Sequence, residues 1–82
     1  SPKSKFFDVV QQASSDIVKD ELDKIVEKLA VLELMLSRKE NEEFDINQKI
    51  REYIANNMDE VENMKKGLYV EFSGEIIQRL DS

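Results

Sequence analysis

The sequence predicts an all-α fold: an antiparallel hairpin of two long helices with short helices at its N- and C-terminal ends. Three observations carry this prediction. Apolar side chains recur at alternating steps of four and three residues between residues 16 and 38, which places them on one stripe of a helix. A similar ladder follows from residue 46. The 82 residues contain only two glycines and one proline, so turn signals are few.

The chain is too short for more than one domain, and 82 residues bury only a limited core. Domains of this size are often stabilised by disulfides, metal ions or association with another chain. The sequence has no cysteine and no histidine, which excludes disulfides and removes the commonest metal ligands. We therefore expect residues 1–82 to form one helical domain, a three- or four-helix bundle that a second copy could complete.

A short amphipathic helix is expected over residues 5–13. Phe6 and Phe7 lie four and three residues before Val10, so the three side chains fall on one face. Two serines then interrupt the apolar pattern, and Ser15 is a suitable N-cap for the next helix. The pattern leaves open whether the chain breaks at these serines or continues as one helix.

The first long helix is expected over residues 16–38. Six of its apolar residues form the ladder: Val18, Leu22, Ile25, Leu29, Leu32 and Leu36. Charged residues cover the other faces of its first half. In the second half, Val31, Leu34 and Met35 lie off the ladder, so the helix is apolar nearly all round. Such a helix is covered on more than one side, by the rest of the chain or by another chain.

The second long helix is expected over residues 46–66, after a polar connection. Asp45 is a suitable N-cap, and Gln48 completes a capping-box pattern. The ladder of this helix continues just beyond it and consists of Ile50, Ile54, Asn57, Val61, Met64 and Leu68. Asn57 either selects the register of an association, as buried asparagines do, or faces water while Met58 takes its place in the core.

A short C-terminal helix is expected over residues 68–81. Gly67, preceded by two lysines, is typical of a helix C-terminus, because basic residues and glycine are favoured there. Beyond it, Phe72 and Ile76 continue the apolar pattern at steps of four. The helix therefore either ends and restarts at Gly67 or continues with a shifted stripe.

The hairpin brings the two ends of the chain together, because both terminal segments leave it at the same end. The aromatic and apolar residues expected to meet there are Phe6, Phe7, Val10, Tyr69, Phe72 and Ile76. The opposite end, near residues 34–36 and 46–50, receives no such cover from this chain. We therefore expect a protein partner or a second copy to bind there, with Val31, Leu34, Met35 and Tyr53 as the contact residues.

The charge pattern argues against several classes of partner. The chain carries a formal net charge of −6 and has no basic patch, which disfavours binding to nucleic acids and to anionic membrane surfaces. No apolar run approaches the roughly 18–20 residues of a membrane span, and no signal-peptide pattern opens the chain. We expect an intracellular protein, cytoplasmic or nuclear, of which the chain is an excised segment.

Residues suited to catalysis are not grouped in any recognisable motif. The 18 carboxylates, including the Asp20-Glu21 pair, lie beside lysines on polar helix faces, which indicates solvated faces rather than an acid–base pair in a cleft. The sequence has no calcium-binding loop and no glycine-rich phosphate loop. We expect no enzymatic activity, no cofactor or metal site, and no small-molecule substrate.

These observations favour a protein–protein interaction or oligomerisation module, an acidic helical domain of a larger scaffold or adaptor protein. Residues 65–81, KKGLYVEFSGEIIQRLD, resemble the last helix of BAG-type Hsp70 co-chaperone domains. That resemblance implies an alternative, a regulatory helical bundle that binds one globular partner. The segment departs from the family pattern because Glu71, Glu75 and a glycine interrupt a run that is usually basic.

Overall fold

The structure, a computed structural model, describes residues 1–39 and 45–80, and these segments contain four α-helices and no strand. The helices are α1 (Pro2–Gln12), α2 (Ser15–Ser37), α3 (Ile46–Asn56) and α4 (Met58–Leu80). The prediction of an all-α fold with two long helices and short flanking helices is confirmed. The connection expected before α3 lies largely outside the described residues, as does the end of the C-terminal helix expected to reach residue 81.

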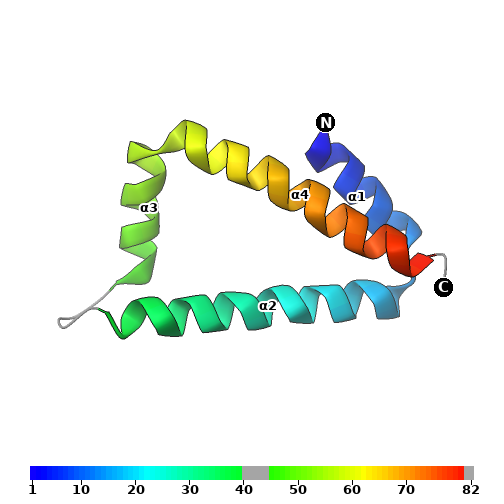
Figure 1. Cartoon of the computed structure of the whole chain (residues 1–82), viewed down its shortest axis with the longest axis horizontal. Helices are drawn as coiled ribbons and strands as arrows, with labels where there is room; N and C mark the ends of the chain where they lie inside the picture. The colour runs from blue at the N-terminus through cyan, green and yellow to red at the C-terminus, as the bar shows by residue number, and fades with distance from the viewer. Residues whose placement is uncertain (40–44, 81–82) are drawn as a thin grey trace.

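The two long helices run in opposite directions, meet at one corner and diverge from there (Figure 1). α3 crosses between their far ends, and α1 packs against the C-terminal half of α4. The backbone extends over 47 × 25 × 14 Å, and its radius of gyration is 15.5 Å. A compact domain of this length has a radius of gyration of about 12 Å. The chain is therefore extended rather than compact, and we call α2, α3 and α4 together the helical frame.

The helix starts follow from local capping side chains. The Ser14 hydroxyl accepts a hydrogen bond from the Ile17 amide at 3.4 Å, and Ala13 before it is extended, so the chain breaks between α1 and α2. The chain therefore breaks at the two serines rather than continuing as one helix, and the N-cap is Ser14 instead of the expected Ser15. The Asp45 carboxylate caps α3 by accepting hydrogen bonds from the backbone amides of Asn47 and Gln48.

The prediction of one long helix over residues 46–66, followed by a separate helix over 68–81, is wrong. The break falls at Asn57, and α4 runs unbroken through Gly67. Asn57 turns the chain because its backbone leaves the helical region (φ −140°, ψ 43°) while its side-chain amide donates to the Tyr53 carbonyl at 3.0 Å. Its own carbonyl accepts from the Val61 amide and begins α4. Met58 is exposed, so it does not replace Asn57 in a core.

Gly67 offers a direct test of this helix assignment. A Cβ atom added at Gly67 would meet nothing within 4 Å, and the residue does not have a positive φ. Gly67→Ala is therefore expected to stabilise the chain by about 0.5–1 kcal/mol, since alanine has the higher helix propensity. Thermal denaturation followed by circular dichroism measures this change. A destabilised variant would show instead that α4 ends at Gly67 in a left-handed turn.

The core of the single chain is much smaller than the ladders predict. Among the described residues, the buried apolar side chains are Val9 and Ile76, at 8% and 2% exposure. Seven of the residues predicted for the core are exposed in the single chain: Leu22, Leu29, Leu32, Leu36, Ile50, Ile54 and Met64. Five others are half-buried: Val18, Ile25, Val61, Leu68 and Phe72. The α2 ladder forms as predicted, whereas the second ladder is divided between α3 and α4 by the break at Asn57. Along most of their length, no helix of the described residues covers these side chains.

Candidate interaction surface

An aromatic cluster joins the N-terminal helix to the C-terminal one. The ring of Phe6 lies 5.4 Å from that of Tyr69 and 6.5 Å from that of Phe72, measured between centroids. Phe7 contacts the same tyrosine, at 6.3 Å. Aromatic pairs at these separations add stabilisation to the area that they bury. The prediction that the two terminal segments meet is confirmed, and this cluster anchors α1 on α4.

A small apolar cavity of about 250 Å³ lies where α1, α2 and α4 converge. Its lining residues are Phe6, Phe7, Val10, Val18, Glu21, Leu22, Ile25, Phe72 and Ile76. Three of them, Val18, Leu22 and Ile25, are the first members of the α2 ladder. The ladder therefore starts against α1 and α4 at the corner, and its later members continue along the same stripe into the frame.

A cluster of four charged residues, Asp20, Glu21, Lys24 and Arg79, closes the corner between α2 and α4; we call it the corner cluster. Arg79 Nη1 donates to Asp20 Oδ2 at 2.7 Å and to Glu21 Oε1 at 2.9 Å. Lys24 Nζ donates to the same oxygen of Glu21 at 3.3 Å. The Glu21 side chain is only 8% exposed, so the expectation that the Asp20-Glu21 pair is solvated is wrong for Glu21.

The charge of Glu21 is stabilised by its partners. The hydrogen bond from Arg79 holds the pKa of Glu21 below its ordinary value, although burial acts in the opposite direction, and Lys24 adds to the lowering. The carboxylate is thus ionised at neutral pH and pairs with Arg79 across 58 positions of sequence. The sequence analysis does not predict this pairing, because the expected meeting of the terminal segments does not include Glu21.

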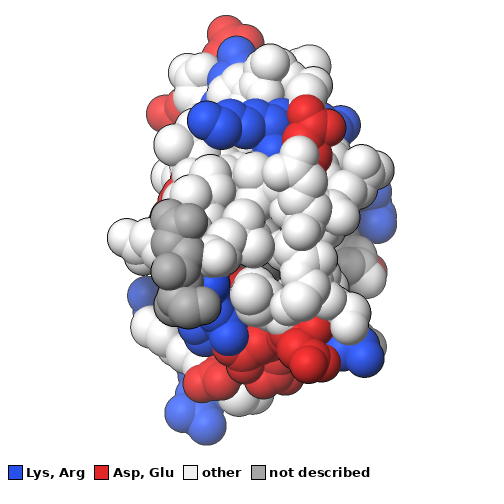
Figure 2. Space-filling model, turned by 90° about the vertical axis from the view of Figure 1, so that its right-hand side faces the viewer, with Lys and Arg blue, Asp and Glu red and all other residues white. Residues whose placement is uncertain are grey.

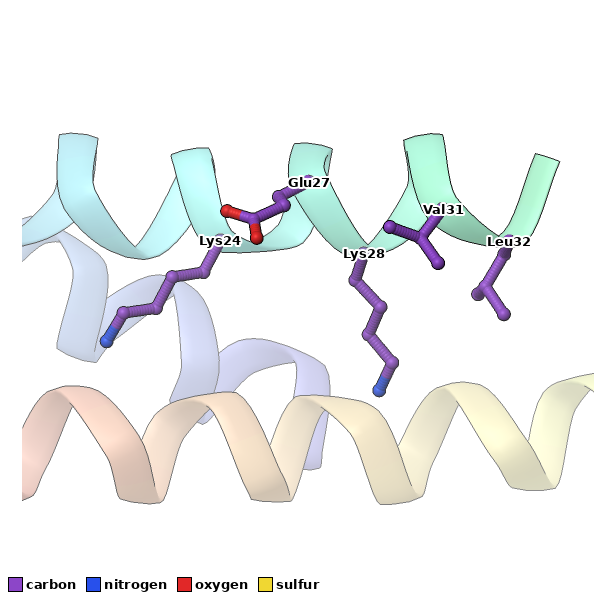
Figure 3. A pocket seen from close by; sticks show the side chains of 5 residues that line it. All are labelled: Lys24, Glu27, Lys28, Val31 and Leu32. Carbon is purple, nitrogen blue, oxygen red and sulfur yellow. The ribbon is translucent and has the colours of Figure 1, made fainter. Parts of the chain in front are cut away.

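Two hollows lie on the helices of the frame. The first runs along α2, where Lys24, Lys28 and Leu32 extend toward α4 and Glu27 and Val31 complete the lining (Figure 3). The second lies at the corner of α3 and α4 and includes Tyr53, Val61, Met64 and Leu68. Three of the five residues that line the first hollow are charged, whereas the second is lined mostly by apolar residues, as the centre of a protein interface is.

The four predicted contact residues are all exposed. Val31 and Tyr53 line the two hollows, one on each side of the frame. Leu34 and Met35, at 56% exposure each, lie farther along α2. Successive residues of a helix turn by about 100°, which puts Leu34 about 140° away from the ladder residue Leu29. The structure thus leaves two faces of α2 apolar and exposed, and sequence reasoning had assigned one of them, the ladder, to the core.

The charged residues border the corner end of the molecule rather than covering it. Figure 2 shows this end with a broad uncharged surface, a band of Lys and Arg above it, and a group of Asp and Glu below it, over α2. Within the described parts of the chain, no group of acidic, cysteine or histidine residues is arranged to hold a metal ion. Within the same residues, no helix has the length and hydropathy required to cross a membrane.

Comparison with known families gives a match over nearly the whole chain. The family model described as "Domain of unknown function (DUF2018)" matches residues 1–81. Comparisons with curated proteins and with solved structures gave no match.

Proposed function

We propose that this chain, which belongs to the DUF2018 family of domains of unknown function, is a non-enzymatic interaction module that works by self-association. The observation that carries this proposal is the apolar ladder of α2. Its later members, Leu29, Leu32 and Leu36, are 42–52% exposed, and Leu32 lines the hollow between α2 and α4 (Figure 3). A stripe of this regularity packs against another helix, and residues 1–39 and 45–80 offer none there.

The exposed area gives the size of the contact. A globular monomer of 9.6 kDa exposes about 5,100 Å². This chain exposes 6837 Å², an excess of about 1,700 Å². Two chains that each buried this excess would form an interface of about 3,500 Å² in total, within the range of obligate homodimers. A small hetero-contact, of about 1,600 Å² in total, would leave much of the ladder in water.

A second copy also matches the frame in shape. Apolar residues line one hollow on α2 and another between α3 and α4, so an occupant that covers both needs apolar surface on more than one side. A long helix that is apolar nearly all round meets this requirement, and the chain has one in residues 29–36 of α2. In a two-fold symmetric dimer, α2 of each chain packs against the frame of the other chain, so no further partner is required.

Molar mass by light scattering, measured over a concentration series, tests the proposal. We expect twice the mass of the 9.6 kDa chain at micromolar concentrations. Leu34→Asp is expected to shift the series toward the monomer with little loss of helicity, since Leu34 is 56% exposed in the single chain and lies off the ladder. A mass that stays at 9.6 kDa in all samples would contradict self-association and favour the second candidate, a helical adaptor or co-chaperone-like regulator that binds a different protein.

A further inference from the structure

The corner cluster joins α2 to α4, and the shape of the frame depends on the angle between these two helices. Arg79, in the last turn of α4, donates two hydrogen bonds to α2. Among the described side chains, these are the hydrogen bonds that join residues distant in sequence. Beyond the corner the two long helices diverge (Figure 1). A small change of angle at this point therefore moves the far parts of α2 by several ångströms, because α2 acts as a long arm.

Apolar contacts alone do not define this angle. The corner contains a cavity of about 250 Å³, and the ladder residue Leu22 beside it is 53% exposed. Apolar packing is non-directional and permits sliding or tilting where it is loose. The hydrogen bonds of Arg79 are directional and charge-assisted, and at 2.7 and 2.9 Å they have the length of strong ones. One nitrogen, Nη1, reaches carboxylates on two consecutive residues of α2, which restricts both the distance and the rotation of that helix.

We infer that Arg79 is a positioning residue: through Asp20 and Glu21 it fixes the angle at which α2 leaves α4, and thereby the width of the frame that receives the partner chain. This inference rests on the proposed function, since it assigns to Arg79 the geometry of that same surface. Lys24 supports the arrangement by binding Glu21 from within α2. The partner-binding ladder then depends on a residue that lies outside it.

Distance measurement between two spin labels tests this inference. The chain has no cysteine, so Ala30→Cys in α2 and Lys66→Cys in α4 provide two unique exposed sites. These sites lie about 15 Å and 20 Å from the corner cluster along their helices. Labelled chains are diluted with an excess of unlabelled chains of the same variant, so that any dimer holds one labelled copy and the measured distance is within one chain.

Arg79→Met is expected to lengthen the mean label distance by about 5 Å, as a 20° change of angle would on these arms, and to broaden the distribution. Self-association should weaken at least tenfold while helicity is unchanged. Arg79→Lys, which keeps one positive charge, should recover part of both effects. Lys19→Met removes an exposed positive charge of α2 and serves as the control, with neither effect expected.

An unchanged distance in Arg79→Met would overturn the inference, as would a longer distance with unchanged association. If Arg79→Met does not fold, the double variant Asp20→Asn/Glu21→Gln replaces both carboxylates by amides of the same size. The same lengthening is expected there, and its absence overturns the inference. A wild-type chain that is monomeric at all concentrations would contradict the proposed function, whereas the label distance would still show whether Arg79 sets the angle.

Discussion

Leu29→Asp is expected to abolish self-association. Leu29 is half exposed in the single chain but lies in the middle of the ladder that the second copy is proposed to cover. A carboxylate buried in an apolar interface without a partner costs about 3 kcal/mol or more, which weakens association at least about 100-fold. Sedimentation velocity at micromolar concentration should therefore find the variant as a monomer where the wild type is a dimer.

The control for this variant is Gln11→Asp, which adds the same single negative charge on the exposed side of α1. It is expected to leave the association constant within a factor of about three, as a surface substitution does. Charge repulsion between two acidic chains would instead weaken both variants alike. A Leu29→Asp chain that associates as tightly as the wild type would show that the ladder is not the contact surface.

Ile76→Ala is expected to cause the largest loss of stability among single truncations. Ile76 is 2% exposed and packs where α1, α2 and α4 meet, in a chain with very little other buried apolar area. Deleting a buried isoleucine side chain to alanine costs about 2–4 kcal/mol, which lowers the melting temperature of a domain of this size by about 10 °C or more. Thermal unfolding followed by circular dichroism measures the shift.

The neighbouring isoleucine makes a matched control. Ile77 is 38% exposed, lies on the same helix and undergoes the same chemical change in Ile77→Ala. Its truncation is expected to cost less than about 1 kcal/mol, because most of its apolar area is not removed from water by the chain itself. Equal losses in the two variants would mean that the corner is not the stable centre of the fold.

The sequence predicted the helices well because their signals are local. Periodicity located the ladder of α2, and Asp45 marked the start of α3 through its capping side chain. The break at Asn57 was assigned to Gly67 instead, since an isolated glycine after two lysines has the local pattern of a helix end. The structure shows instead that α3 ends at Asn57, whose side-chain amide donates a hydrogen bond to the Tyr53 carbonyl.

The candidate surface was harder to predict because a ladder does not state which chain covers it. Leu29 and Ile76 both occupy regular ladder positions, yet one is exposed and the other is buried. The difference depends on the angle between α2 and α4, which periodicity does not determine. The burial of Glu21 is hidden from the sequence for a similar reason: it follows from the approach of Arg79, a contact between residues far apart in sequence.

The central claim, that a second copy occupies the helical frame, is tested most directly by isotope-filtered nuclear Overhauser spectroscopy. A sample that mixes ¹³C-labelled and unlabelled chains reports contacts between methyl groups of different chains. We expect such contacts at the methyl groups of Leu29, Leu32 and Leu36. Intermolecular contacts that involve α1 alone, or none in a sample shown to be dimeric, would contradict the account and place the association elsewhere on the molecule.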